Sequence, residues 1–343
     1  MSSQQAGTDS SVSGHKTLNR LVEESTQSDG PDETDDASRF PYGHVISIKN
    51  DQTNMTSDYL LTRRIGRGGF SEVRLGKLRS DRSRRFAIKL VDLKKPKAQR
   101  IGRQTHCEID ILRRFDDSDF VVQLLDFKIV EDDCIFMVLE LGGQSLDSLY
   151  KKRRGRTDHS ALKIKIRAHQ CVKCIEACHS LNVLHCDVKP NNFIFTGNKL
   201  KLIDFGCATA IGPMDEAVIR KKSLGTTRYM SPEYLNDKIA SKSLDVWSLG
   251  CVLFWLFTGD KIWKGSKRDL KRIITTRHLN FAVVTDPDAR QLLESIFDRD
   301  RHQRPSCSKV LKSTYFTRTD DAKSPKRRSR NKSKSKSRTH PSY

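Results

Sequence analysis

Two short motifs, taken together, constrain this 343-residue chain more than any other feature of its sequence. The first is HCDVKPNN at residues 185–192, and the second is DFG at residues 204–206. A DFG triplet alone is typical of a turn, but H-x-D-x-K-P-x-N with a second aspartate 17 residues after the first is not a chance pattern. Acid, lysine and amide groups at such fixed offsets are what a transferring phosphoryl group needs for positioning and charge neutralisation.

Each polar group in these motifs has a role in that chemistry. Asp187 can accept the proton of a substrate hydroxyl group, and Lys189 can neutralise the moving γ-phosphate. The side-chain oxygen atoms of Asn192 and Asp204 are ligands of the kind that Mg²⁺ prefers. The motifs therefore predict a transferase whose cofactors are ATP and Mg²⁺.

An upstream lysine and glutamate complete the predicted set of charges. Lys89 ends the strand-like stretch Ala87-Ile88-Lys89, where a lysine is usually an exposed edge charge. Glu108 lies 19 residues later, and apolar residues at offsets of three, four and seven from it mark the same helix face. We predict that Glu108 holds Lys89 against the α- and β-phosphates, because the rival Asp110 points about 200° round the helix.

A glycine-rich stretch precedes both residues. Glycines let backbone N–H groups approach phosphates closely, although this signal alone is weak because glycine-rich hairpin turns are common. The usual G-x-G-x-x-G-x-V pattern also has serine in place of its third glycine here. The residues predicted to bind the nucleotide are Ile65, Gly66, Arg67, Gly68, Gly69, Phe70, Ser71, Glu72, Val73, Ala87, Lys89, Glu140 and Gly142.

The order of hydrophobic patterns predicts an α+β fold with two unequal lobes. Short stretches rich in apolar or β-branched residues indicate strands at 59–65, 72–77, 86–92, 121–129 and 134–140. The apolar spacing indicates helices ending at 115 and covering 161–181, 243–258, 269–276 and 288–297. A small sheet with one helix should therefore precede a larger helical lobe, with a hinge near Gly142.

Residues 59–317 resemble the eukaryotic protein kinase fold, of the Ser/Thr class, almost throughout. The run GTTRYMSPE at 225–233 is similar to the family's substrate-platform and A-P-E segment. The run SLDVWSLG at 243–250 resembles the buried helix that supports the catalytic loop, and Arg304 matches the arginine that pairs with the residue equivalent to Glu233. For Glu233, Arg304 and the Asp of the helix, we expect structural support rather than catalysis.

The resemblance implies a bilobal domain, with an N-lobe over 59–141 and a C-lobe over 142–317. It also implies that the Glu140 carbonyl and the Gly142 amide read the edge of adenine. Three apolar side chains would sandwich the base: Ile65, Val73 and Ala87.

Closer similarity to the monopolar-spindle checkpoint kinases, the TTK-type dual-specificity family, appears at IFMVLELG (135–142), NFIF (192–195) and LKLIDFG (200–206). This resemblance implies phosphorylation of Ser or Thr, sometimes Tyr, and a role in mitotic checkpoint signalling. Lys189 and Thr226 favour Ser/Thr hydroxyl substrates. The alternatives are a Ser/Thr kinase of another signalling branch, a pseudokinase scaffold that binds nucleotide without catalysis, and a polyanion-binding protein that depends on its basic tail.

One departure from the family concerns regulation. The residue before Asp187 is Cys186, where the family usually carries an arginine that grips an activation-loop phosphate. We hypothesise that activity here depends less on that grip, although Arg220 and the lysines after it could serve a phosphate on Ser223 or Thr227. A Cys186→Arg variant that gained phosphate-dependent activity would support this hypothesis, and equal dependence in the unmodified chain would contradict it.

Charge is distributed unevenly along the chain, whose formal net charge is +21. Residues 1–58 hold 10 acids and 4 bases, and residues 323–343 hold 9 bases and no acid, so 59–322 keeps 21 + 6 − 9 = +18. We expect 1–58 to be an acidic disordered segment and 318–343 a basic disordered tail. The basic middle, including the run at 151–154, favours acidic Ser/Thr sites in protein substrates, unless these charges merely coat a solvated loop.

The basic tail predicts where the protein acts and what it binds weakly. It is typical of a nuclear-import signal, so we expect the nucleus, with the cytoplasm as the other location. Sequence-specific nucleic-acid binding is not expected, because no reader module accompanies the charge, but the tail could bind polyanions non-specifically. The sequence does not indicate an oligomeric state.

The remaining patterns exclude other classes. The longest apolar run, at 246–257, is too short to span a bilayer, and no secretory signal is visible, so we expect an intracellular protein with no membrane partner. Its nine cysteines should be reduced thiols. Cys171, Cys174 and Cys178 could form half a zinc site with the adjacent His179, but their spacing favours the buried face of a helix.

Overall fold

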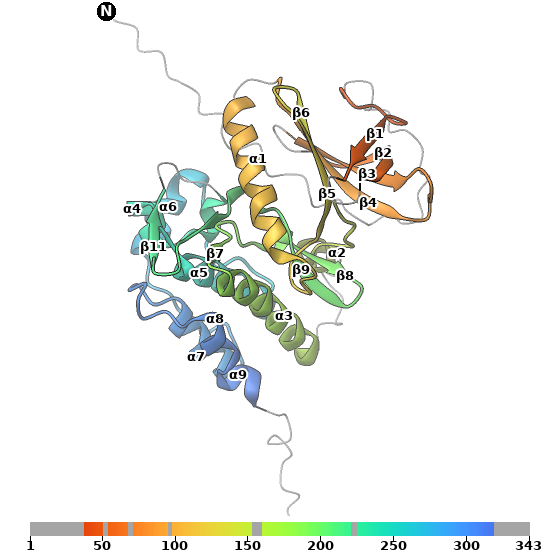
Figure 1. Ribbon diagram of the computed structural model, residues 1–343. Coiled ribbons are helices and arrows are strands. Elements are labelled where there is room, and N and C mark those ends of the chain that lie inside the picture. Colours follow the sequence, from red (N-terminus) through yellow and green to blue (C-terminus); the bar gives the residue numbers. More distant parts are fainter. Residues whose placement is uncertain are drawn as a thin grey trace, which may run out of the picture.

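The computed structural model describes residues 38–50, 54–67, 71–94, 98–152, 160–220 and 225–318 (Figure 1). A sheet-rich N-terminal lobe lies beside a larger, mainly helical lobe. The predicted bilobal α+β fold is therefore confirmed.

The small lobe is built on an antiparallel six-stranded sheet with the order β1-β2-β3-β4-β6-β5. Its strands are β1 (Val45–Lys49), β2 (Thr56–Arg67), β3 (Ser71–Leu78), β4 (Arg85–Asp92), β5 (Leu124–Val130) and β6 (Cys134–Glu140). Helix α1 (Ala98–Leu112) lies beside this sheet and continues into the 3₁₀ turn η4 (Arg113–Phe115). This arrangement leaves α1 between the sheet and the large lobe.

The prediction that all of residues 1–58 is disordered is wrong for its last part. Strand β1 pairs antiparallel with β2, so that Val45 lies opposite Leu60. Phe40 and Ile46 are buried, and the Phe40 ring packs edge-on against Phe136 at 5.2 Å between centroids. The apolar residues in this stretch are few and their alternation is short, so the acidic composition of the whole stretch concealed a real strand. Residues 1–37 lie outside the described part of the chain.

The large lobe surrounds a helix that is buried along almost its whole length, α5 (Lys242–Thr258). Around it lie α2 (Leu146–Lys152), α3 (Ala161–Ser180), α4 (Pro232–Asp237), α6 (Lys267–Thr276), α7 (Pro287–Ile296), α8 (Cys307–Leu311) and α9 (Thr314–Thr317). Side-chain caps begin several of them: Ser160 accepts from the Lys163 amide at 3.3 Å, and Asp286 accepts from the Ala289 amide at 3.1 Å.

Three short antiparallel strand pairs connect these helices. They are β7 (Val183–Leu184) with β10 (Thr209–Ala210), β8 (Phe193–Thr196) with β9 (Lys199–Leu202), and β11 (Ala217–Ile219) with β12 (Ile239–Ser241). The segment after β6 pairs with β8, because the Gly143 amide donates to the Phe195 carbonyl at 2.6 Å. The backbone next to residue 142 is thus attached to the large lobe, and the hinge near Gly142 stays a prediction.

The cysteine cluster belongs to the core. Cys171, Cys174 and Cys178 are fully buried on α3, and the Cys174 thiol donates to the Leu200 carbonyl at 3.3 Å. The His179 ring contacts Asp245 through Nε2 at 3.1 Å and the Cys307 thiol through Nδ1 at 3.8 Å, and does not contact the three cysteines of α3. The prediction of a buried helix face is therefore confirmed.

Within the described ranges, no helix is both long and apolar enough to cross a membrane.

Candidate active site

Asp245, a buried residue of α5, accepts hydrogen bonds from the backbone of the loop that carries the HCDVKPNN motif. The Oδ2 atom of Asp245 accepts a hydrogen bond from the His185 amide at 2.8 Å, and its Oδ1 atom accepts one from the Cys186 amide at 2.9 Å. Asp245 is fully buried, and Cys186 has φ = 60°, in the left-handed region. These bonds hold a backbone conformation that would otherwise cost free energy, so Asp187 projects from a rigid loop.

The Asp187 carboxylate lies at the centre of a compact polar network. Its Oδ1 atom accepts a hydrogen bond from the Thr226 amide at 2.8 Å, and its Oδ2 atom forms an ion pair with Lys189. The Lys189 ammonium also donates to the Thr226 hydroxyl at 3.2 Å. The Asn192 amide group donates to the Asp187 carbonyl at 2.9 Å. The structure thus brings Asp187, Lys189 and Asn192 together, and it adds Thr226 from the predicted substrate platform.

Lys89 on β4 and Glu108 on α1 form the predicted pair. The Lys89 ammonium donates to both Glu108 oxygen atoms at 2.7 Å and lies 4.0 Å from Oδ1 of Asp204. Burial alone would lower the pKa of Lys89, but the attraction of Glu108 and Asp204 outweighs it and leaves that pKa raised. Lys89 is therefore a permanent cation at the point where α1, the sheet and the DFG segment meet.

The DFG segment is oriented by the ring of Phe205. This ring is almost fully buried and packs on the ring of Phe115 at 5.6 Å and on the ring of His185 at 5.0 Å between centroids. Asp204, which precedes it, has φ = 66° and ψ = 71°. With the phenyl ring anchored in the core, the Asp204 carboxylate turns toward Lys89 and the cavity between the lobes.

An apolar cavity extends from Lys89 and Asp204 to the hinge. Its walls include the predicted Val73, Ala87, Glu140 and Gly142 and also Leu139, which the sequence placed at the back of the adenine pocket. They further include Leu112, Val122, Ile194 and Ile203, which the sequence patterns did not single out as cavity residues. Ile65 packs with Val73 and Ala87 in one small cluster above it. The apolar walls suit a heteroaromatic base, with the charged groups Lys89, Glu108 and Asp204 in the same lining.

The carboxylate groups of Glu140 and Glu72 are bound by neighbouring side chains and are not available to a nucleotide. Glu140 accepts from the Lys201 ammonium at 2.7 Å, so its backbone rather than its side chain remains for a nucleotide. Glu72 accepts from Arg74 at 2.9 Å and from Ser38 at 2.7 Å.

The glycine-rich stretch is described only in part. Gly66 and Arg67 are paired with β3, and Ser71 begins that strand. Gly68, Gly69 and Phe70 lie outside the described residues.

Two oxygen-bearing side chains fit a divalent cation. Asn192 uses its Nδ2 atom as a donor to the Asp187 carbonyl, which leaves its Oδ1 atom as the available acceptor. Asp204 supplies a carboxylate next to the same cavity. Hard cations such as Mg²⁺ take few protein ligands and complete their shell with phosphate oxygens and water, and this donor set agrees with that habit. In the described part of the chain, no cluster of three or more His, Cys, Asp or Glu side chains could hold a metal by itself.

A third buried ion pair supports the platform. Arg304 donates to Glu233 through Nη1 at 2.7 Å and through Nη2 at 2.9 Å, and its guanidinium lies 4.7 Å from the centroid of the Trp247 indole ring. The same guanidinium donates to the Asp298 and Ser243 carbonyls. As expected, these residues connect helices and do not approach the cavity.

The sequence patterns gave no indication of a role for Asp147 on α2. Its carboxylate accepts from the Asn191 amide group at 3.0 Å and from the Lys151 ammonium at 2.6 Å. Lys151, the first residue of the basic run, thus lies beside an acid, which weakens its field at the substrate side. Residues 153–159 lie outside the described part. Only the spacing of Asp147 four residues before Lys151 could have indicated this pair.

Gly225 provides a test of the platform geometry. It has φ = +94°, and a Cβ atom there would lie 2.5 Å from the Cys186 carbonyl oxygen and 3.3 Å from Oδ1 of Asp187. Gly225→Ala should therefore displace Thr226, whose amide binds Asp187, and lower kcat at least about tenfold, since each 1.4 kcal/mol of lost alignment is a factor of ten. Steady-state kinetics with a peptide substrate checks this.

Gly259 is the matched control for that substitution. It ends α5 with φ = +75°, and a Cβ atom there would have no neighbour within 4 Å. Gly259→Ala should cost about 1–2 kcal/mol of stability from backbone strain alone and leave kcat unchanged. If both variants lose activity equally, strain rather than the contact with the catalytic loop is responsible, and our account of Gly225 is wrong.

Comparison with protein-family models agrees with this geometry. The model described as "Protein kinase domain" matches residues 59–316. The chain belongs to the protein kinase family.

The most similar curated relatives found include TTK-type enzymes, which confirms the resemblance seen in the motifs. The chain is 29% identical over 273 residues to a mouse "Dual specificity protein kinase TTK", covering 75% of this chain and 31% of the relative. It is also 29% identical over 273 residues to a Dictyostelium discoideum "Probable serine/threonine-protein kinase mps1", covering 75% of this chain and 27% of the relative. An Arabidopsis thaliana "Serine/threonine-protein kinase PEPKR2" is 31% identical over 282 residues, covering 79% of this chain and 56% of the relative. The matched region is thus about a third or less of the two TTK-type relatives.

Proposed function

We propose that this kinase transfers the γ-phosphate of ATP to Ser or Thr hydroxyl groups of protein substrates. The observation that carries the proposal is the position of Asp187, which is held by Thr226 and Lys189 while the Lys89–Glu108 pair is formed. A hydroxyl group that approaches Asp187 would meet a base whose second oxygen neighbours an ammonium group. Thr226 contacts Lys189 directly, which suits an aliphatic hydroxyl substrate.

In this proposal the chain's own groups orient the nucleotide. Lys89 holds the α- and β-phosphates, Lys189 offsets the charge on the transferring group, and the apolar cavity excludes water from the base. Mg²⁺, held by Asn192 and Asp204, would supply further neutralisation of phosphate charge when bound. Tyr as an additional acceptor is proposed only by analogy with the dual-specificity name of the mouse relative.

The pathway and location are finer proposals. The similarity to TTK- and Mps1-named kinases supports a role in mitotic checkpoint signalling, and the basic tail supports import into the nucleus. The comparable identity to PEPKR2 keeps another branch of Ser/Thr signalling as the alternative. The excess of basic residues over 59–322 supports acidic Ser/Thr sites as substrates, although the Asp147–Lys151 pair reduces that contribution.

The test is phosphate transfer by the full chain onto an arrayed peptide library with ATP and Mg²⁺. We expect transfer to Ser and Thr peptides with acidic flanks, and a loss of that preference at high salt because the Debye length shrinks to about 3 Å at 1 M. Transfer to basic or proline-directed peptides would keep the enzyme and overturn the acidic-site proposal. Nucleotide binding without transfer to any peptide would overturn the proposed activity and favour a scaffold.

A further inference from the structure

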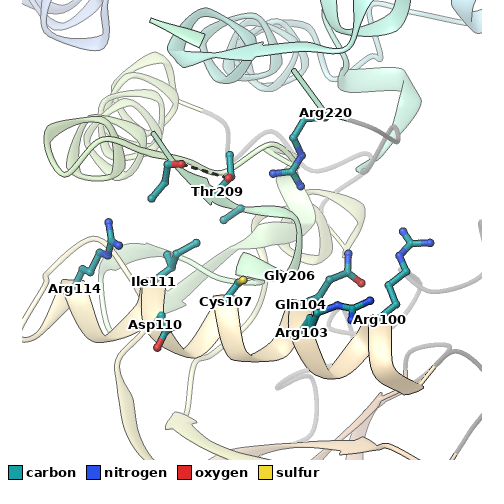
Figure 2. A pocket seen from close by; sticks show the side chains of 12 residues that line it. Arg100, Arg103, Gln104, Cys107, Asp110, Ile111, Arg114, Gly206, Thr209 and Arg220 are labelled. Atoms are coloured by element: carbon teal, nitrogen blue, oxygen red, sulfur yellow. Dashed lines mark hydrogen bonds between the residues drawn. The ribbon is translucent and has the colours of Figure 1, made fainter. Parts of the chain in front are cut away.

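A second cavity, which shares no lining residue with the nucleotide cavity, lies between α1 and the segment that follows the DFG motif (Figure 2). Its volume is about 370 Å³. Four arginines line it, and we call it the arginine cavity: Arg100, Arg103 and Arg114 of α1 and its 3₁₀ extension, and Arg220 just after β11. Figure 2 shows Arg220 reaching toward α1 from the opposite wall.

The arginines of α1 and its extension form a stripe along one face. Residues seven apart on a helix lie within about 20° of each other, so Arg100, Cys107 and Arg114 are nearly in line, and Arg103 lies one turn before Cys107. Asp110 is the one acid in the lining, seven residues after Arg103 and four before Arg114. The Arg220 guanidinium donates to the Cys207 carbonyl at 3.4 Å, a long bond to a neutral acceptor.

Positive charge exceeds negative charge in this cavity, because four arginines and one aspartate line it. Among the residues that the structure describes, none provides a carboxylate within ion-pair distance of the four arginines. A guanidinium group can bind a carboxylate through two parallel hydrogen bonds. Several guanidinium groups in one cavity repel each other, and a bound anion offsets this repulsion. The arginine cavity therefore has the chemistry of a site for an acidic peptide.

The described chain begins on the face of the sheet opposite to α1, because Phe40 packs with Leu90 and Phe136, whereas Val91 and Ile135 pack in the core that contains α1 residues. Arg39 forms an ion pair with Asp92 at 3.1 Å. Leu93, which follows Asp92, packs against α1, and its Cδ2 atom lies 3.5 Å from the point where a Cβ atom of Gly102 would be. Ser38, the first described residue, donates a hydrogen bond to the Glu72 carboxylate on β3 at 2.7 Å. A segment attached at Ser38 must therefore pass round the end of the sheet to reach α1.

Those residues are the most acidic stretch of the chain. Residues 29–36, DGPDETDD, hold five acids and no base, and only Ala37 separates them from Ser38. Eight extended residues span about 26 Å, whereas a helix with its side chains is about 10–12 Å across. The stretch is thus longer than a helix is wide, and a connection this short gives an effective concentration on the order of millimolar when its end can reach a site.

We propose that the arginine cavity is a docking site for an acidic peptide and that its occupant is residues 29–36 of the same chain. Five carboxylates match four guanidinium groups, and the tether removes most of the entropic cost of association. Single exposed ion pairs contribute little, so the docking depends on several pairs acting together and weakens with salt. The inference concerns a surface away from the nucleotide cavity and does not depend on the substrate class proposed above.

Cys107 makes the proposal testable in the full chain, because it lines the cavity and is the one exposed cysteine of the nine. Thr34→Cys introduces a partner thiol within the acidic segment without removing an acid. Diamide oxidation followed by peptide mass spectrometry measures the rate at which the introduced thiol forms an intramolecular disulfide with Cys107. We expect that replacing all five acids with Asn or Gln in this background slows cross-linking about tenfold at low salt, at an unchanged tether length.

The arginine side is tested in the same background. Arg103→Gln with Arg220→Gln should slow cross-linking to a similar extent after correction for the reactivity of Cys107 toward neutral iodoacetamide. Arg113→Gln is the matched control, because this guanidinium lies over the Phe127 ring, 5.9 Å from its centroid, and does not line the cavity. It should leave the rate unchanged.

Three results would overturn the proposal. A rate that is indifferent to the charge of residues 29–36 would show that the tether alone brings the thiols together. Sensitivity to the arginines without sensitivity to these acids would assign the cavity to another anion. Disulfide-linked dimers in place of the intramolecular product would assign it to the acidic segment of a second copy.

Discussion

Asp187→Asn is expected to lower kcat for peptide phosphorylation by about 10²–10⁴-fold, the range that a positioned general base contributes. The asparagine oxygen can still accept from the Thr226 amide, so the loop keeps its shape, but the amide cannot take up the hydroxyl proton. The ion pair with Lys189 is lost as well. Nucleotide affinity should change little, because Lys89 and Glu108 are untouched. Single-turnover kinetics with nucleotide-binding titration separates the two quantities.

A chemically identical change elsewhere controls for nonspecific effects. Asp119 is an exposed acid that pairs with Lys199 at 2.8 Å, and Asp119→Asn should leave kcat within about twofold of the unmodified chain because exposed pairs contribute little. Retention of full activity by Asp187→Asn would remove the carboxylate from the proposed mechanism. A matching loss in both variants would point to damaged protein.

Glu233→Gln is expected to cause a large loss of stability. The Arg304 side chain is fully buried, and removing the charge of its partner leaves an uncompensated guanidinium in the core. Breaking a buried pair on one side costs about 3–5 kcal/mol. For a domain of this size each kcal/mol lowers Tm by about 2–4 °C, so calorimetry or a thermal shift should show a fall of roughly 6–20 °C.

The exposed pair Lys264–Asp260, at 3.0 Å, is the control. Asp260→Asn should cost less than about 1 kcal/mol, because both groups remain hydrated. The double variant Glu233→Gln, Arg304→Met should recover part of the loss, since it removes the unpaired charge. Equal shifts for Glu233→Gln and Asp260→Asn would contradict the role that we assign to burial.

Much of the site was predictable because its chemistry is local in sequence. Asp187, Lys189 and Asn192 lie within six residues of each other, so one loop conformation places them together. The pairing of Lys89 with Glu108 was predictable from helix periodicity, which turned Glu108 toward the sheet and Asp110 away from it. The positions of the predicted strands and helices followed from apolar spacing, with errors of a few residues at their ends, whereas α2, α4, α8, α9 and the short strands of the large lobe were not predicted.

Other parts of the site depend on long-range contacts that leave little trace in the sequence. The sequence does not distinguish three apolar cavity residues from ordinary core residues: Val122, Ile194 and Ile203. They line one cavity only in the folded structure. The burial of Phe40 and the pairing of β1 were missed because the acidic composition of residues 1–58 masked a single short alternating stretch. The platform residue Thr226 reaches Asp187 across 39 positions, a contact that local patterns cannot specify.

The sequence by itself determined the family, the fold class and the reacting groups, because those depend on residue types at short, fixed spacings. The resemblance already implied that the Asp245 helix supports the catalytic loop and that Arg304 pairs with Glu233, whereas only the tertiary structure gave the atoms and burial of these contacts and showed that arginines from α1 and Arg220 line one cavity. The physical reason is that these contacts join segments far apart in the chain. Their energies arise from burial and charge pairing, which exist only once the two lobes have folded.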